Sequence, residues 1–533
     1  MTVGDCTTLD AASLTAPVHH GETLIAPGAH ALACMAKTGG ASLDHGSVKL
    51  LDGSLANVRR RVRSALAGAA DRPVVVVGHQ PAFYHAGVWA KHVVADRLAR
   101  AVGGVALNLV VDNDAPKQTT IAVPVEHAGH LVVRRVRYAD LPSGDPYEHI
   151  PLQDEGTIAR FESSLHEALG ARYDKSQCPT FFEGFRAIVD ARDWVDQAVA
   201  GRRAVEARFG IELIDHRISD VWCGPLLADI IVHAERFRSA YNRALARYRT
   251  ANRIRGNDRP IPDLSRCGGE IEIPAWVYQP RGRRHRLFVR RDGERFVFST
   301  EHEVIGSVSA ADLGRLDSAD AALLSLAPWG LRPRALTLTL WARLLLADVF
   351  IHGIGGAKYD AITDEIIRDY YGIRPPPIAC VSATLMSDLP HERVSIDTVR
   401  QAEHRLRDVG FNPQRHTDND VGLGGLIEAR ADAVRVADKL KRSQSADRTA
   451  RRRAFDDIHR ATAAIISARP DLEAAARADV EWLHQALRQT RLATDREYFF
   501  GLHHNDRLQE LLDALPSIET LRGGGFEGRV KKR

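Results

Sequence analysis

Blocks of hydrophobic and polar residues along 74–114 predict a strand, a helix and a second strand. Four valines, 74–77, form an apolar run that ends at Gly78-His79-Gln80. Helical periodicity follows over 88–98, and a second apolar run, 105–111, stops at Asp112-Asn113-Asp114. This order predicts a βαβ unit with two parallel strands. Ligands bind beyond the carboxyl ends of strands in open parallel sheets, so we expect the site there.

A second stretch, 328–386, has a similar pattern of hydrophobic and polar blocks. Its pattern predicts a helix over 336–346, a strand over 349–352, a glycine turn at 353–356 and a helix over 359–371. Residues 378–386 read as a further strand. We therefore expect a discontinuous α/β core that the chain leaves and re-enters.

Other segments differ from this core. Residues 226–255 predict one long amphipathic helix, and 269–298 predict an antiparallel meander that forms a lid, an insert or an edge of the main sheet. From 391 to 515 the chain is mostly helical. Two heptad-like seams there, 455–465 and 480–490, fit antiparallel helices within one chain or a dimer arm.

The predicted fold class is α/β: a Rossmann-like parallel-sheet core with a small antiparallel β insert and a C-terminal helical, coiled-coil-like arm. The expected domain ranges follow the chain. They are an N-terminal segment packing on the core (1–71), the first part of the core (72–260), the meander (261–308), the second part of the core (309–390), the helical domain (391–515) and a flexible basic tail (516–533).

The composition limits the classes of protein to which this chain could belong. Of 533 residues, 44% are hydrophobic and 26% charged, as in globular proteins. The net charge of +4 gives no case for a nucleic-acid or membrane surface, and no apolar run has the length of a membrane span. Six cysteines without CxxC spacing, and no signal-peptide pattern, predict a cytoplasmic protein with reduced thiols.

The first strand end offers candidate chemistry. Gly78 allows close approach of a ligand, His79 can move protons near neutral pH, and Gln80 both donates and accepts hydrogen bonds. Asp112 and Asp114, two residues apart in extended chain, point the same way, and Asn113 lies between them. A capped turn and a solvated polar cluster are the structural alternatives.

The second stretch offers an anion site. Gly353, Gly355 and Gly356 precede a helix whose amides can hold a phosphate or carboxylate, with Lys358 as counter-charge. Arg332, with Arg334 nearby, could clamp the same group. The alternative is a tightly packed helix start and a surface arginine pair. The His19-His20 and His503-His504 pairs lack a third ligand at recognisable spacing, so no metal site is expected.

These motifs resemble the cysteine-adding enzymes of bacillithiol synthesis. In that family a strand runs into a G-Q-Q-P turn, here Gly78-His79-Gln80-Pro81, and a second strand ends in S-E-D-H-D, whose last three positions match 112–114. An R-P block and a glycine-rich turn follow, as at 332–333 and 353–356. The chain departs from the family where it has His79, Val111, Asn113 and Ala357, which implies a relative with another substrate.

The resemblance implies a ligase that joins an amino-acid carboxylate to the amine of a sugar-like acceptor, with a nucleotide such as ATP as the activator. Its catalytic residues would be His79, Asp112 and Asp114. It also implies small-molecule partners and a homodimer through the helical arm. A non-catalytic nucleotide- or sugar-binding protein with the same core is the alternative, and an assembly protein built on the arm is a third class.

Overall fold

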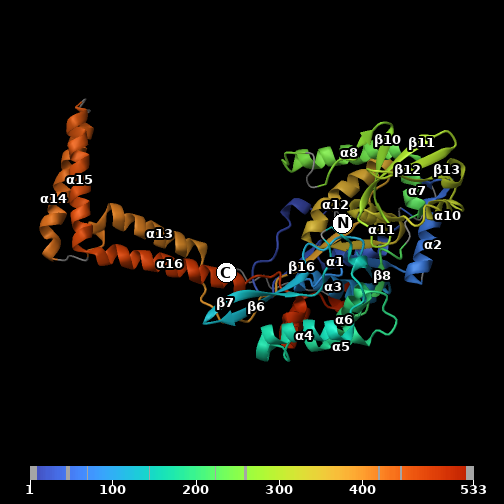
Figure 1. Cartoon of the computed structure of the whole chain (residues 1–533), viewed down its shortest axis with the longest axis horizontal. Helices are drawn as coiled ribbons and strands as arrows, with labels where there is room; N and C mark the ends of the chain where they lie inside the picture. Colours follow the sequence, from blue (N-terminus) through green and yellow to red (C-terminus); the bar gives the residue numbers. More distant parts are fainter. Residues whose placement is uncertain are drawn as a thin grey trace. The chain divides into compact units, whose positions relative to one another are not determined.

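The computed structural model describes residues 9–41, 43, 48–68, 70–142, 144–221, 224–256, 261–417, 421–443 and 447–523 (Figure 1). These residues form two compact units. Unit 1 holds the described residues of Met1–Val123, Arg134–Met386 and Arg496–Arg533, and unit 2 holds those of Pro124–Val133 and Ser387–Asp495. The helical domain expected over 391–515 therefore ends earlier in the chain, because residues 496–515 belong to unit 1.

Unit 1 is built on a six-stranded, mostly parallel sheet. Its strands, in order across the sheet, are β1 (Thr23–Ala26), β16 (Ile378–Ala383), β15 (Val349–His352), β4 (Val74–His79), β5 (Val105–Val110) and β8 (Ile214–Arg217). Only β1 runs antiparallel to its neighbour. The mixed α/β fold with a mainly parallel sheet is confirmed, and the chain re-enters the sheet through β15 and β16.

The valine run becomes β4 because both faces of this strand are covered. Val74 and Val76 belong to a core that includes α11 (Ala335–Leu345), and α3 (Ala86–Val102) packs against β4, β5 and β16. A strand buried on both faces reads as a continuous apolar run. The ends of α3 are set locally: the His85 ring accepts a hydrogen bond from the Gly87 amide at 3.0 Å, and Gly103 ends the helix in the left-handed conformation.

The helix after β15 begins earlier than its pattern predicts. The prediction of a glycine turn followed by a helix over 359–371 was wrong at its start, because α12 spans Ile354–Ile366 and its first turn contains Gly355 and Gly356. A helical turn of π type, Ile367–Tyr371, continues it. Gly353 is the N-cap residue and supplies no side chain to the first amides.

The meander is part of a separate antiparallel sheet. Its strands, in order, are β13 (Val304–Ser309), β12 (Arg295–Ser299), β11 (His285–Asp292), β10 (Glu270–Tyr278) and β14 (Gly330–Pro333), with β9 (Arg266–Cys267) also beside β10. The edge-of-sheet alternative is therefore excluded. One continuous hydrophobic core contains residues of both sheets.

Further helices of unit 1 complete the core. The predicted helix over 226–255 is two helices, because His233 leaves the helical backbone between them. These and the others are α1 (Ala29–Thr38), α2 (Leu55–Ala67), α4 (Glu155–Leu169), α5 (Cys178–Ala187), α6 (Trp194–Arg208), α7 (Gly224–Val232), α8 (Ala234–Ala251), α9 (Ala310–Leu313) and α10 (Ala319–Leu324). A two-residue hairpin joins β2 (Lys49–Leu50) to β3 (Gly53–Ser54).

The end of the chain packs on α3. Helices α17 (Asn505–Ala514) and α18 (Ile518–Arg522) both contact it, and the Arg97 guanidinium donates to the Leu512 carbonyl at 2.8 Å. Residues 518–522 of the predicted flexible tail are therefore helical and packed, and 524–533 lie outside the described residues. Phe500 is stacked on Trp89 of α3, with ring centres 5.3 Å apart.

Unit 2 consists of paired helices and the tip of a hairpin. The hairpin joins β6 (Thr120–His127) to β7 (His130–Arg137). Helix α13 (Ile396–Phe411) packs on α16 (Pro470–Ala493), and α14 (Gly424–Arg442) packs on α15 (Arg448–Ala468), as Figure 1 shows. The seam residues Leu483 and Leu487 face α13. The 480–490 seam thus has a partner helix within the chain, whereas Phe455 of the other seam is exposed; the coiled-coil arm and the homodimer stay predictions.

No helix among the described residues combines the length and the apolarity that a bilayer span needs. Of the six cysteines, four lie in the described part of the chain, and each of these is a free thiol: Cys34, Cys178, Cys267 and Cys380.

Candidate functional site

A cavity of about 770 Å³ lies at the carboxyl edge of the main sheet, where β4 and β15 end. These two strands are parallel neighbours, with Val77 opposite Ile351, so the segments that follow them emerge at the same edge. Eight residues proposed from the sequence line this cavity. They are Gly78, His79, Gln80, Asn113, Asp114, Gly353, Gly355 and Gly356.

Asp112, predicted to be catalytic, does not line the cavity. It is fully buried and accepts hydrogen bonds from the Arg217 Nε at 2.7 Å, from the Ser219 amide at 2.9 Å and from the Ser219 hydroxyl. Burial raises the pKa of this carboxyl, and the Arg217 charge opposes that shift. The expected common orientation of 112 and 114 is not observed, because the strand ends at Val110 and the two residues no longer alternate as they would in extended chain.

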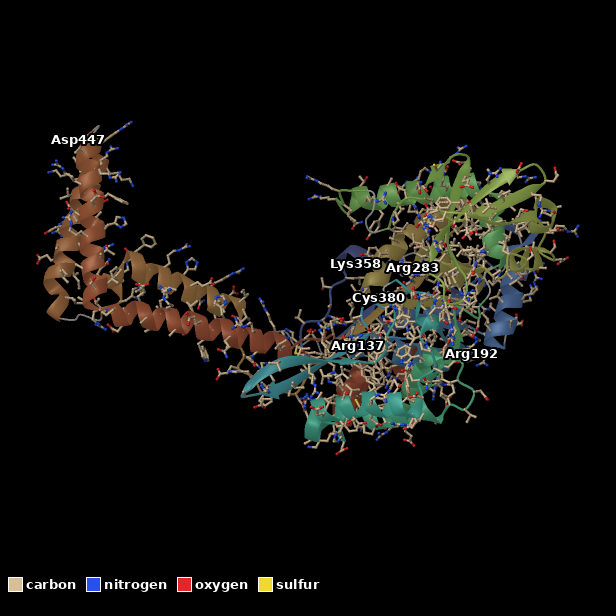
Figure 2. The ribbon with its side chains drawn as sticks, viewed as in Figure 1. Arg137, Arg192, Arg283, Lys358, Cys380 and Asp447 are labelled. Atoms are coloured by element: carbon tan, nitrogen blue, oxygen red, sulfur yellow. The ribbon has the colours of Figure 1, made fainter. Side chains whose placement is uncertain are left out.

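Arg332 and Lys358 also lie elsewhere. Arg332 is in β14 and pairs with Glu148 at 3.1 Å, on the wall of a second cavity of about 1170 Å³. Lys358, labelled in Figure 2, lines a different cavity because α12 begins at Ile354 and carries this side chain away from the glycines. Neither cation contributes to the cavity at the ends of β4 and β15.

Of the two arginines proposed as an anion clamp, Arg334 is the one that lines this cavity. It is the N-cap residue of α11, donates from Nη1 to Glu272 at 2.8 Å and stacks over Trp276 with its Cζ 4.4 Å from the ring centre. Among the described residues, its buried Nε and Nη2 have no hydrogen-bond partner. Since a guanidinium has five N–H donors and this one lines the cavity, it is available to an anionic ligand.

Arg496 is a second guanidinium in the wall. It donates from Nη2 to the Ser382 hydroxyl at 2.8 Å, and its Nε lies 3.6 Å from a carboxylate oxygen of Glu497. Its Nη1 is buried without a hydrogen-bond partner in the described part of the protein. Burial lowers the pKa of Arg496, and a guanidinium stays charged regardless. Its place far along the chain from every other site residue left no local signal in the sequence.

Lys91 is the third cation. It lies on α3, is 2% exposed, and donates from Nζ to the Gly78 carbonyl at 2.9 Å. Burial lowers the pKa of this ammonium from 10.5 to about 8. A lysine on a helix that covers the sheet edge is the signal that could have identified it, because α3 is otherwise buried along most of its length.

His79 is neutral in this setting. Dense packing around the ring, and then the Lys91 charge, hold its pKa well below the usual value. The Nδ1 atom lies 3.0 Å from the Gln80 carbonyl, which can only accept, so the neutral ring carries its lone pair on Nε2. His79 can therefore take a proton from a ligand.

The amino end of α12 adds backbone donors to the cavity. The first amides of a helix lack intrahelical partners, and Gly353 offers no capping side chain. Gly356 is packed so closely that a Cβ there would lie 2.7 Å from the Nδ1 of His352. That ring is fixed by Asp360, 3.1 Å from its Nε2, and Asp360 in turn pairs with Arg343 at 2.7 Å.

Acidic and amide groups close the other side. Gln80 donates from Nε2 to Asp114 at 2.9 Å, which joins the ends of β4 and β5, and Arg284 holds the same carboxylate at 3.1 Å. Asn113 donates to the Pro333 carbonyl at 2.9 Å, while its buried Oδ1 lacks a hydrogen-bond partner among the described residues. The apolar part of the lining includes Tyr241, Pro262, Leu336, Leu338 and Phe350.

The arrangement suits a small amphiphilic anion. The cations and amides would bind its charged group, and the apolar wall would pack against its apolar part. Models of known protein families give no match to this chain. Curated proteins give no match either, so the geometry carries the functional argument.

Proposed function

We propose that the protein is an enzyme that forms an amide bond between a carboxylate and an amine in the cavity at the ends of β4 and β15. The observation that carries the proposal is the convergence of Arg334, Arg496, Lys91 and the α12 amides on one cavity with an apolar wall. Buried donors without partners are costly, so a site that keeps them is suited to a ligand that satisfies them.

A carboxylate is a poor electrophile until one oxygen becomes a leaving group. A nucleoside triphosphate such as ATP supplies that activation by transferring a phosphoryl or nucleotidyl group. The cations would bind the anionic groups before reaction and stabilise charge as it develops on them. A cavity of about 770 Å³ has room for a drug-sized ligand.

His79 is the proposed base. Its Nε2 would take the proton of the attacking amine, and an anion bound beside it would raise the pKa of the ring and make it a better acceptor. Gln80 and Asp114, joined to each other, would orient the amine. The resemblance to the cysteine-adding enzymes of bacillithiol synthesis supports a sugar-like acceptor, through Gly78-His79-Gln80-Pro81 and the glycines at 353–356.

One observation favours a second candidate, a binding protein without turnover. Of the three residues first assigned to catalysis, Asp112 is held in a buried ion pair and Asp114 has hydrogen-bond partners on both oxygens. Only His79 keeps an unbonded proton acceptor. A site that lacked a working base would still bind an anionic nucleotide or sugar derivative.

The test screens full-length protein by thermal shift against nucleotides, amino acids and amino sugars. Binders are then incubated in pairs with ATP, and mass spectrometry looks for an amide product together with ADP or AMP. We expect His79→Ala to lower turnover by about 10²–10⁴-fold with an unchanged melting temperature. Binding without product in every pair would favour the second candidate, and no binding at all would contradict both.

A further inference from the structure

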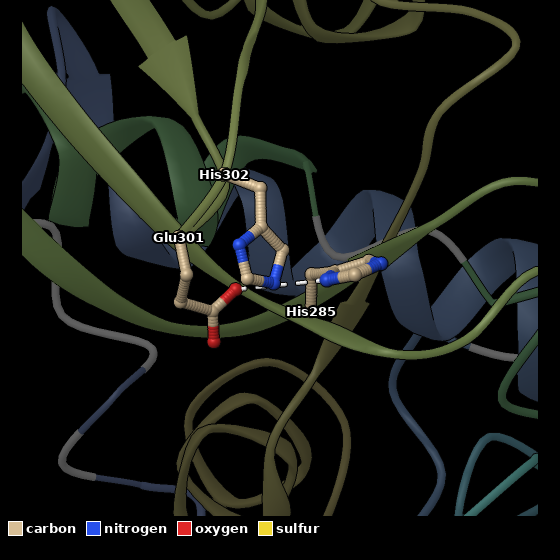
Figure 3. Close-up of side chains that lie close together, drawn as sticks. All are labelled: His285, Glu301 and His302. Carbon is tan, nitrogen blue, oxygen red and sulfur yellow. Dashed lines mark ion pairs between the residues drawn. The ribbon is translucent and has the colours of Figure 1, made fainter.

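Three side chains on the antiparallel sheet bring metal-ligating atoms together, and none of the three lines the cavity of the proposed function. His285 is the first residue of β11, and Glu301 and His302 lie in the turn between β12 and β13. Their donor atoms all lie within 4.8 Å of one another. Figure 3 shows the two rings and the carboxylate turned toward a common point. We infer that these residues bind a zinc ion.

The distances fit one ion shared by three ligands. Zinc bonds to nitrogen and oxygen are about 2.0–2.1 Å, which puts two ligand atoms of a tetrahedral site about 3.3–3.5 Å apart. The Nδ1 of His285 lies 3.7 Å from the Oε2 of Glu301. The same geometry puts the centres of two coordinating imidazoles about 5 Å apart, and the rings of His285 and His302 are 5.6 Å apart at 88°. Small side-chain rotations therefore suffice to close the site.

The backbone holds the ligands in place without the ion. The Thr300 hydroxyl accepts hydrogen bonds from the amides of His302 and Glu303, both at 3.1 Å, which fixes the turn. His285 is held in register opposite Val277 of β10. Because the backbone already positions the ligating side chains, less conformational entropy is lost when an ion binds.

The side chains around the three ligands are consistent with zinc binding. Arg286 donates from Nε to the Oε1 of Glu301 at 2.8 Å, and its backbone amide donates to both carboxylate oxygens at 3.2 Å. These bonds orient the carboxylate, with Oε2 3.7 Å from the Nδ1 of His285. Such outer contacts are a regular feature of metal sites. Trp329 packs against the His285 ring, with centres 6.2 Å apart. Two imidazoles and one carboxylate suit zinc and leave the fourth position for water.

A surface ion pair between a protonated His285 and Glu301 is the competing explanation, and it needs nothing from His302. Zinc binding needs all three side chains. The role of His302 therefore separates the two explanations.

The experiment measures zinc binding to tag-free, full-length protein by equilibrium dialysis against zinc chloride, in wild type, His302→Ala and His285→Ala. We expect one bound equivalent to weaken at least tenfold in both variants. His404→Ala, which removes an exposed histidine of α13, is the matched control and should bind as wild type does. Cobalt(II) in place of zinc should show the visible absorption of a tetrahedral site in wild type and in His404→Ala, and should not show it in His302→Ala or His285→Ala.

Equal zinc affinity and stoichiometry in wild type, His302→Ala and His285→Ala would overturn the proposal, because any bound zinc would then be held elsewhere, for instance by the exposed Cys267 thiol. Circular dichroism of the zinc-free proteins checks the fold. If an alanine variant were misfolded, His302→Gln would replace it and is expected to give the same loss. This outcome is independent of amide formation, which concerns a different cavity.

Discussion

Asp112→Asn and Asp114→Asn each replace a carboxylate with an amide. Comparing the two variants distinguishes an aspartate that stabilises the fold from one that acts in the cavity. Asp112 is fully buried and accepts three hydrogen bonds, whereas the Asp114 side chain is 44% exposed and lines the cavity. In Asp112→Asn, the NH₂ group takes the place of one carboxylate oxygen and faces either the Arg217 Nε or the Ser219 amide, both of which are donors, so one of these hydrogen bonds is lost. Asp114→Asn keeps an acceptor for Gln80 and has solvent beside it.

The expected cost follows from the contacts. A hydrogen bond to a charged group is worth about 1.5–3 kcal/mol, and a buried donor that loses its acceptor adds to that cost. Arg217 keeps Asp193 and Asp196, at 2.7 and 2.9 Å, so its charge stays compensated and the full penalty of breaking a buried ion pair does not apply. We expect Asp112→Asn to lower the free energy of unfolding by about 2–4 kcal/mol.

Differential scanning fluorimetry and urea denaturation measure this effect. For a unit of this size, about 1 °C of melting temperature corresponds to 1 kcal/mol, so Asp112→Asn should melt about 2–4 °C lower than wild type. Asp114→Asn should keep the wild-type melting temperature and lose ligand binding or turnover. A melting temperature of Asp112→Asn within experimental error of wild type, together with lost activity, would refute the structural assignment of Asp112.

Three further predictions concern the cavity. Burial lowers the pKa of Lys91 to about 8, so the side chain loses its positive charge as pH rises through that value. Calorimetry should therefore show weaker anion binding above pH ~8 than below it, and Lys91→Met should remove this dependence. Arg334→Met should weaken binding of the same anion at least about tenfold, while Arg332→Met, on the wall of another cavity, should leave the dissociation constant unchanged. Gly356→Ala should lower the free energy of unfolding by about 1–3 kcal/mol, because its Cβ meets the fixed histidine ring at the end of β15, whereas Gly355→Ala, where a Cβ has no neighbour within 4 Å, should not; equal losses in urea denaturation would contradict this account of the packing.

The core elements were predictable because they are local. A buried parallel strand must be apolar throughout, and the helix that covers it repeats every three to four residues, so β4, α3 and β5 can be read from 74–110 alone. The position of the cavity follows from the same rule. Gln80 and Asp114 end adjacent parallel strands, and they are bonded to each other in the structure.

The sequence did not predict which of the basic side chains line the cavity. Arg332 and Arg334 differ in the sequence only by position, and it is the pairing of β14 with β10 that turns one toward Glu148 and the other toward Trp276. Lys358 was misplaced because glycines were read as a turn, although two of them are the first residues of α12.

Four strands of the main sheet, β4, β5, β15 and β16, and the edge where polar residues collect could be predicted from local pattern, because they depend on periodicities within a few residues. Which charges meet at that edge depends on contacts between distant segments. Lys91, Arg334 and Arg496 come from three distant segments, and their convergence depends on strand order and helix packing over hundreds of residues. No local pattern records that convergence, since the contacts that fix it lie between segments and not within them.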